Sequence, residues 1–436
     1  MVDVVVPQSG RRLSLGGTAA RAALLNIGRG LVALLASVII TRALGPAGRG
    51  LFSFVTNAIG VLVLLSTAGS PAALTRAKAK LGASVGQLYG AALLMAGLFG
   101  GSASAAFLVL YAITRGSLFV GVTSHEAILV IALVPLVLLT GLWGGVAYLE
   151  GRVLQVGYYA FLSVLALLGV AVPLALAGRL TPTTIVVAWS ATNLIPLVLL
   201  ARRAFNRATK PGYVLVRTLV IYSLRTNVAS LALVLVWRLD VFMVKGFRGY
   251  QELGSYAVAV SIGEILLQVA ISLRVALVPL QGSEENRRKL QNAIELSTRV
   301  TLWVGGLGAF ALAAASRPLV ELLYGATFAT AAGAVALIVP GIVFVIAQGP
   351  LIDFLLVEGK VRQVTFAAVV SLGINVVMNV ALLPHHTYIV ASLSSTVSYL
   401  IGFMLCARAY NSLTRAGISS LVVVRRADFA MMAGRR

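Results

Sequence analysis

The sequence predicts an all-α, polytopic membrane protein with twelve transmembrane helices. Of its 436 residues, 59% are hydrophobic and only 11% are charged, and the mean hydropathy is +0.97. Soluble chains average about 45–50% apolar and about 25% charged residues. Because each membrane span needs about 20 apolar residues, twelve spans with their loops occupy the whole chain. Functions that require a large soluble domain are therefore not expected.

Twelve apolar segments follow one another along the chain. The first six lie at about 20–41, 51–72, 86–112, 127–149, 155–177 and 183–201, and the other six at about 219–244, 254–280, 298–315, 330–356, 361–383 and 387–407. This pattern predicts four regions: an N-terminal six-helix lobe at 1–201, a basic cytoplasmic connector at 202–217, a C-terminal six-helix lobe at 218–410 and a basic cytoplasmic tail at 411–436.

The basic residues predict the topology. Most of the 35 Lys and Arg residues fall in alternate connections if both termini are cytoplasmic, and short cytoplasmic loops retain positive charge. Arg42 and Arg49 fall on the opposite, outer side in this scheme. The net charge of +22 is therefore expected to face the inner membrane surface, and it does not indicate a nucleic-acid partner. We expect a plasma-membrane protein whose first apolar segment is retained as a helix.

The two halves show a weak internal repeat. An offset of 204 residues places the sequence GLF at 50–52 on GSY at 254–256 and places Arg21 on Arg225. In both halves the matched segment begins the second span, so the halves share one orientation. An even number of spans in each half predicts a parallel repeat.

Three motifs resemble those of polysaccharide biosynthesis flippases. They read TRALGPAGRGLFS at 41–53, ELGSYA at 252–257 and PLVELLYG at 318–325. The chain is similar over its twelve spans to the Wzx-like transporters of the multidrug/oligosaccharidyl-lipid/polysaccharide (MOP) superfamily, although Arg49 stands where many relatives carry an aromatic residue. The resemblance implies a central cavity that opens alternately to either side. It also implies a lipid-linked oligosaccharide as cargo, carried on polyprenyl pyrophosphate to the outer leaflet, with polysaccharide assembly machinery as a partner.

Arginines within the spans are the candidate receptors for such a cargo. A guanidinium group binds phosphate oxygens in a bidentate manner, and an arginine at a helix centre costs about 2.5–3.5 kcal/mol on insertion scales. Arg29 lies about nine residues into its span, roughly 13 Å from the cytoplasmic end. Asn26 shares its helix face. The remaining candidates, Arg225, Arg274 and Arg21, lie closer to the interface, where snorkelling to the headgroups is an alternative role.

Three carboxylates within the spans are candidates for coupling transport to a Na⁺ or H⁺ gradient: Asp240, Glu264 and Asp353. At 100° per residue, Asp240 shares a helix face with Arg225 and is expected to face the cavity, whereas Arg238 is expected to point away. The alternative is that these carboxylates are structural partners of Arg238 or Arg274.

Several absences limit the chemistry. The chain has three histidines, one cysteine and no GxxxxGK[ST] phosphate loop, so we expect no metal site, no cofactor, no ATPase activity and no enzyme.

A cation-coupled multidrug antiporter of the same superfamily remains the first alternative, although its cavity would favour acidic residues over arginines. A membrane-embedded polysaccharide polymerase or ligase needs positioned catalytic groups on the outer side, where the predicted loops are short. A third alternative, a scaffold in a cell-envelope assembly, would not explain why arginines are buried in the spans.

Overall fold

The computed structural model describes residues 15–67, 69–277, 287–417 and 419–423. Every regular element in these ranges is a helix, as the sequence predicts. The N-terminal half comprises α1 (Leu15–Thr67), α2 (Ser70–Leu81), α3 (Val85–Met95), the π-helical turn η1 (Ala96–Gly100), α4 (Gly101–Thr114), α5 (Ser124–Leu149), α6 (Val153–Leu176), α7 (Pro182–Asn193) and α8 (Ile195–Arg207).

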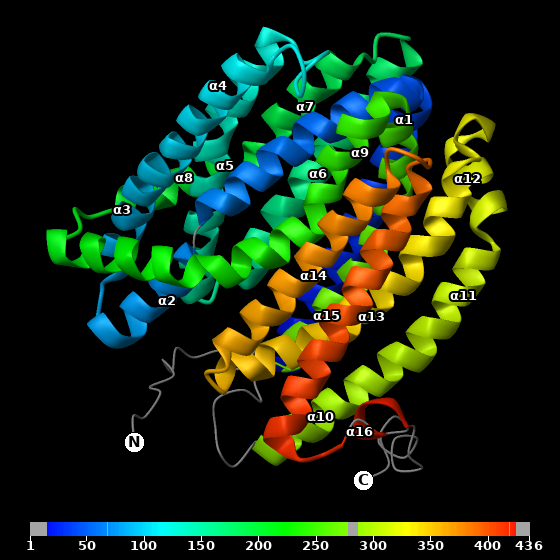
Figure 1. Cartoon of the computed structure of the whole chain (residues 1–436). Helices are drawn as coiled ribbons and strands as arrows, with labels where there is room; N and C mark the ends of the chain where they lie inside the picture. The colour runs from blue at the N-terminus through cyan, green and yellow to red at the C-terminus, as the bar shows by residue number, and fades with distance from the viewer. Residues whose placement is uncertain (1–14, 68, 278–286, 418, 424–436) are drawn as a thin grey trace.

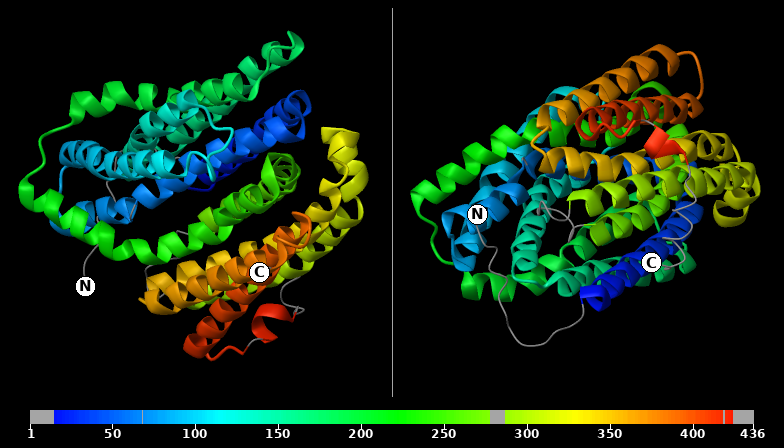
Figure 2. Two further views of the ribbon diagram at one scale, coloured as in Figure 1. Left: turned by 45° about the horizontal axis from the view of Figure 1, so that its top comes forward. Right: turned by 90° about the horizontal axis from the view of Figure 1, so that it is seen from below.

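The C-terminal half has a similar composition of elements. It comprises α9 (Tyr213–Leu277), α10 (Arg287–Val300), the π-helical turn η3 (Thr301–Gly305), α11 (Gly306–Ala314), α12 (Ser316–Tyr324), the 3₁₀ turn η4 (Ala326–Phe328), α13 (Ala331–Val357), α14 (Val361–Leu382), α15 (Ile389–Thr414) and α16 (Ser419–Val422). In Figures 1 and 2 the helices of the two halves form two groups, and α1 and α9 pack against each other between them.

Two helices are too long to cross a bilayer once. At 1.5 Å per residue, the 53 residues of α1 and the 65 residues of α9 extend over about 80 Å and about 98 Å, whereas the hydrocarbon core is about 30 Å thick. Each helix bends sharply at a glycine: Gly45 has φ 66° and ψ −179°, and Gly249 has φ 78° and ψ −175°. Residues other than glycine rarely adopt this backbone conformation. The two glycines therefore divide α1 and α9 into two spans each.

The bends confirm the predicted number of spans. Nine helices of the described residues are long and apolar enough to cross a membrane, with α1 counted once. Dividing α1 at Gly45 and adding the two halves of α9 gives twelve. Gly45 and Gly249 are separated by the same 204 residues that relate Gly50 to Gly254, so the weak sequence repeat corresponds to a structural one.

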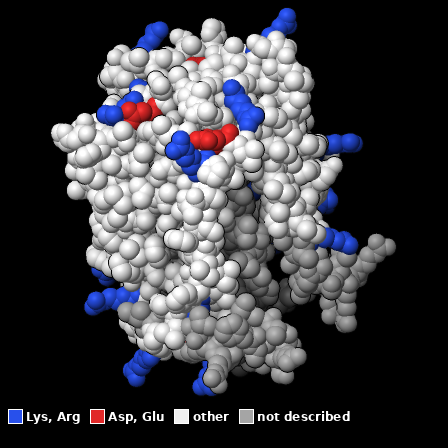
Figure 3. All heavy atoms as spheres, turned by 90° about the vertical axis from the view of Figure 1, so that its right-hand side faces the viewer, with Lys and Arg blue, Asp and Glu red and all other residues white. Residues whose placement is uncertain are grey.

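The charged side chains are distributed as a membrane protein requires. In Figure 3 most Lys and Arg side chains lie toward the upper and lower parts of the visible face or along its right-hand margin, and the middle of its left-hand part shows no charged side chains. Large apolar side chains such as Leu176, Leu307 and Phe310 are exposed, and in a multi-pass membrane protein such side chains face lipid.

The predicted basic connector is mostly helical. Arg202, Arg203 and Arg207 lie in α8, and Arg217 lies in α9. The segment 208–212 alone is non-helical. The backbone amide of Thr209 donates a hydrogen bond to the carbonyl of Gly86 at 3.0 Å, so the start of this segment is attached to α3.

Candidate functional site

Two cavities adjoin at the interface between the two groups of helices. One has a volume of about 440 Å³ and the other of about 330 Å³, within the size range of ligand pockets. Their walls share five residues: Arg49, Phe52, Trp189, Ser261 and Glu264. A third cavity of about 50 Å³ adjoins them on the C-terminal side.

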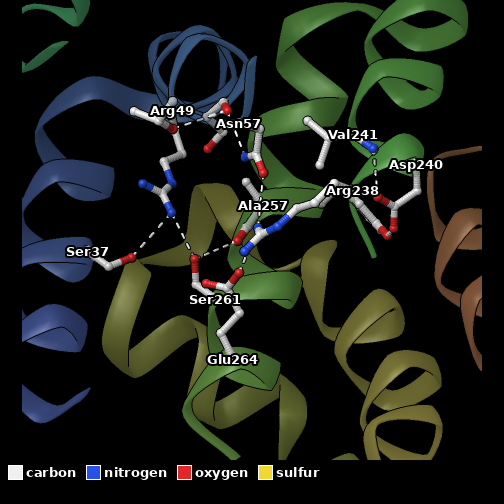
Figure 4. Close-up of polar contacts among 12 residues, drawn as sticks. Ser37, Arg49, Asn57, Arg238, Asp240, Val241, Ala257, Ser261 and Glu264 are labelled. Carbon is white, nitrogen blue, oxygen red and sulfur yellow. Dashed lines mark hydrogen bonds and ion pairs between the residues drawn. The ribbon is translucent and has the colours of Figure 1, made fainter. Parts of the chain in front are cut away.

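Arg49 lies at the junction of the two larger cavities. Its side chain is buried, with 7% of the residue surface exposed. Its Nη2 donates hydrogen bonds to Ser261 Oγ at 2.8 Å and to Ser37 Oγ at 3.4 Å, as Figure 4 shows. Its Nε has no hydrogen-bond partner, and no described carboxylate forms an ion pair with it. A buried guanidinium without an ion-pair partner is costly, and a negatively charged group in the cavities would offset that cost.

The position of Arg49 corrects the prediction from the sequence. Arg49 was assigned to an outer loop because the second span was expected to begin at residue 51. The bend at Gly45 is followed at once by helix, so Arg49 lies on the first turn of the second span and reaches the cavity. The signal available in the sequence was GPAG at 45–48, a glycine and proline pair that is typical of a tight bend.

Arg238 also reaches this interface, contrary to the expectation that it points away. Its Nη1 lies 2.8 Å from Glu264 Oε1 and donates a hydrogen bond to Asn57 Oδ1 at 3.0 Å. Asn57 belongs to the second half of α1, whereas Arg238 and Glu264 belong to α9. Glu264 is thus an ion-pair partner of Arg238, the arrangement that the alternative interpretation of this carboxylate describes, and the polar contact bridges the two halves of the chain (Figure 4).

Arg29 lines the larger cavity together with Thr140, Ser163 and Asn193. Asn26, one turn earlier on α1, is partly buried, and Arg21, eight residues before Arg29, is exposed. Among the described residues that line the two larger cavities, three arginines, Arg29, Arg49 and Arg238, accompany one carboxylate, that of Glu264, which gives these residues a net charge of two positive units. Arg225 and Arg274 lie on α9, but their side chains are outside the described residues.

Asp240 lies in a separate polar cluster on the C-terminal side. It is 2% exposed; its Oδ2 accepts hydrogen bonds from Tyr256 Oη and, at 3.3 Å, from Ser395 Oγ. Asn375 Nδ2 donates to the same Ser395 Oγ at 3.3 Å, and Asn379 Nδ2 donates to Asn375 Oδ1 at 3.0 Å. Asp240 lines the small third cavity, between α9, α13 and α15, and does not face the central cavities as expected.

Asp353 is distant from this cluster. It lies near the C-terminal end of α13, eight residues beyond Val345, which lines the third cavity. Eight residues correspond to about 12 Å along a helix. The structure thus brings Glu264 and Asp240 together in the lining of the third cavity and leaves Asp353 apart. Among the residues that the structure describes, no group of three or more His, Cys, Asp or Glu side chains is placed to hold a metal ion.

The two halves are in close contact at the bends. A Cβ atom on Gly50 would lie 1.9 Å from the carbonyl oxygen of Tyr250, and one on Gly254 would lie 1.8 Å from that of Pro46. Around this contact Tyr250 Oη donates to the carbonyl of Val120 at 2.8 Å, and Lys245 Nζ donates to those of Ser117 and Leu118. Backbone contacts and these hydrogen bonds join the two halves at the bends.

Comparisons with known proteins agree with this architecture. The family model described as polysaccharide biosynthesis protein matches residues 19–283, which is more than half of the chain. The chain belongs to the polysaccharide biosynthesis protein family. The MatE family model matches residues 227–381 of this family member. No curated protein matches the sequence.

Several solved structures share the fold of this polysaccharide biosynthesis family member. An inward closed conformation of the lipid II flippase MurJ matches with a TM-score of 0.68 and 12% identity, covering 94% of this chain and 95% of the other. An outward-facing multidrug resistance MATE transporter matches with a TM-score of 0.61 and 15% identity, covering 92% of this chain and 97% of the other. A third match is a MOP-superfamily transporter from Pyrococcus furiosus, described as having a binding pocket of reverse polarity. Its TM-score is 0.61 at 14% identity, and the match covers 91% of this chain and 96% of the other.

Proposed function

We propose that this protein moves a lipid-linked oligosaccharide, carried on a polyprenyl diphosphate, from the cytoplasmic to the outer leaflet of the cell membrane. The observation that carries the proposal is the buried guanidinium of Arg49, which has no carboxylate partner among the described residues and faces both central cavities. A sugar-linked polyprenyl diphosphate carries two negative charges, which would balance the net charge of two positive units on the described residues of the cavity walls.

The other lining groups suit the rest of such a cargo. Hydroxyl and amide side chains at Ser37, Thr140, Ser163 and Asn193 supply hydrogen bonds for sugar hydroxyls. Closure of the two halves at Gly50 and Gly254 supports an alternating-access mechanism, in which that contact opens while the opposite end closes. The polysaccharide biosynthesis family of the chain and the flippase fold of MurJ support the same assignment.

Reconstitution in liposomes tests the proposal. A fluorescent polyprenyl-diphosphate oligosaccharide is placed in one leaflet, and its movement to the other is followed with wild type and with Arg29→Ala. We expect transfer with wild type and at least about a tenfold slower transfer with Arg29→Ala, since a hydrogen bond to a charged group contributes about 1.5–3 kcal/mol. Equal transfer rates for the two proteins would contradict the role of Arg29, and no transfer by wild type would contradict the proposed function.

Asp240 is proposed as the group that couples this movement to a Na⁺ or H⁺ gradient. Its carboxylate is buried and lies between helices of the C-terminal half, and buried carboxylates in membranes commonly mark ion pathways. Asp240→Asn is expected to remove the dependence of transport rate on an imposed Na⁺ or H⁺ gradient. Asp353→Asn serves as a matched comparison, because Asp353 was an equal candidate by sequence. Loss of gradient dependence in Asp353→Asn alone would transfer the role to Asp353.

A cation-coupled multidrug antiporter is the second candidate function. The MatE match over residues 227–381 and the buried Asp240 favour it. Transport of a cationic dye against an ion gradient, with no transfer of the diphosphate lipid in the same liposomes, would establish the antiporter and exclude the flippase.

A further inference from the structure

The ion pair between Arg238 and Glu264 is accessible from the cavities. The two charged groups lie 2.8 Å apart, yet the side chains of Arg238 and Glu264 retain 34% and 42% of their surface exposed. In contrast, Glu150, which pairs with Arg203 and Arg207 at the turn between α5 and α6, has only 7% of its side chain exposed. Partly exposed ion pairs contribute little to stability. The contact between Arg238 and Glu264 is thus easily opened by a competing group.

Glu264 also lies beside the second guanidinium of the site. Ser261, which accepts the 2.8 Å hydrogen bond from Arg49, is three residues before Glu264 and therefore on the same face of α9. Figure 4 shows the guanidinium groups of Arg49 and Arg238 approaching the region of Ser261 and Glu264 from two sides. The carboxylate of Glu264 is thus an anion in the space between two arginines, one of which it neutralises.

We infer that Glu264 is a displaceable counter-ion, which occupies a phosphate position in the cargo-free protein and restricts the cargo to groups with two negative charges. The inference rests on the proposed function and specifies the charge of its cargo. A phosphodiester with one charge replaces the carboxylate on Arg238 without any net gain. A diphosphate diester has a second charge, which reaches Arg49 while the first replaces Glu264. The displaced carboxylate turns toward the cavity, where it is already partly exposed.

The test measures binding of two synthetic probes to the full-length protein in detergent micelles. One probe is geranyl-diphosphate-linked N-acetylglucosamine and the other is its geranyl-phosphate-linked counterpart, which differ by one negative charge. Wild type is expected to prefer the diphosphate probe. Glu264→Gln keeps the side-chain shape and removes the charge, so we expect it to bind the monophosphate probe about tenfold more tightly and to lose most of the preference. Glu321→Gln, which removes the carboxylate of an exposed pair with Arg317, is the matched control and is expected to bind as wild type does.

The outcomes separate this inference from the proposed function. If wild type prefers the diphosphate probe but Glu264→Gln binds both probes no more tightly, Glu264 is not a competitor and the inference is wrong while the proposed function stands. If neither wild type nor the variant binds either probe, both fail. Glu264→Asp is a second variant that controls for a folding defect in Glu264→Gln. It keeps the negative charge, but its shorter side chain holds the carboxylate farther from Arg238. It is expected to tighten monophosphate binding by about threefold, and unchanged or weaker binding in a monodisperse Glu264→Asp protein would also overturn the inference.

Discussion

Replacing Arg49 by Gln is expected to abolish detectable transfer of the diphosphate lipid while leaving the protein folded. A charge-assisted hydrogen bond contributes about 1.5–3 kcal/mol, and each 1.4 kcal/mol is a factor of ten in affinity. Apparent affinity for the cargo should therefore fall by about 10- to 100-fold. Folding should not suffer, because the substitution removes a buried charge that has no carboxylate partner among the described residues. The measurement is transfer in liposomes together with gel filtration and thermal unfolding of the purified variant.

Two further variants make the result for Arg49 specific. Arg49→Lys keeps the charge but loses the planar group that binds two oxygens at once, so an intermediate rate is expected. Arg317→Gln removes an arginine whose side chain is 78% exposed on α12 and should transfer cargo at the rate of wild type. Wild-type rates in Arg49→Gln would show that the buried guanidinium has a structural role only.

Replacing Gly254 by Ala is expected to force the two halves apart at the bends. The added Cβ would lie 1.8 Å from the carbonyl oxygen of Pro46, a backbone atom that no change of rotamer can move. The closed contact then becomes strained, and the population shifts toward conformations in which this end is open. About 5.5 kcal/mol is enough to shift a two-state equilibrium from 1:99 to 99:1. Transport should be lost, because the protein can no longer complete its cycle.

Distances between spin labels measure this shift. Arg115 at the end of α4 and Arg317 on α12 are exposed and lie in different halves, so they are suitable labelling sites once Cys406, the single native cysteine, is replaced by Ala. The distance between the labels should increase in Gly254→Ala. Gly246→Ala is the matched control on the same helix, because a Cβ there would meet no atom within 4 Å. An unchanged distance in Gly254→Ala would show that the contact at Gly254 does not hold this end closed.

Hydropathy was sufficient to predict the twelve spans and the helical fold class. The span boundaries near the bends were less accurate, because the segment at 42–50 contains glycine, proline and two arginines and reads as a loop. Its backbone is nevertheless helical on both sides of Gly45, and Arg49 and Gly50 at its end are buried. The sequence therefore places Arg49 in a loop, whereas it places Arg29 correctly within a span.

The sequence also does not predict which way the charged side chains of α9 point. The expected orientation of Arg238 and Asp240 was measured from Arg225, on the assumption that one face of the helix borders one cavity. In the structure, Arg238 borders the interface between the halves, while Asp240, two residues later, accepts a hydrogen bond from Ser395 on α15. A helix that packs against neighbours on both sides can place polar side chains in two different environments. The periodicity of the sequence alone does not show which environment a given side chain enters.

The contact at the bends has the form of a homodimer interface. Gly50 meets Tyr250 and Gly254 meets Pro46, and the same 204 residues separate Pro46 from Tyr250 and Gly50 from Gly254. Each half thus presents the same patch to the other, as the two subunits of a twofold symmetric dimer do. The residues of the cargo site break this symmetry, since Arg49 corresponds to Leu253 and Glu264 to Gly60. The contact at the bends therefore belongs equally to both halves, whereas Arg49 and Glu264, which we assign to cargo recognition, each occur once and give the pseudosymmetric scaffold a single, oriented binding site.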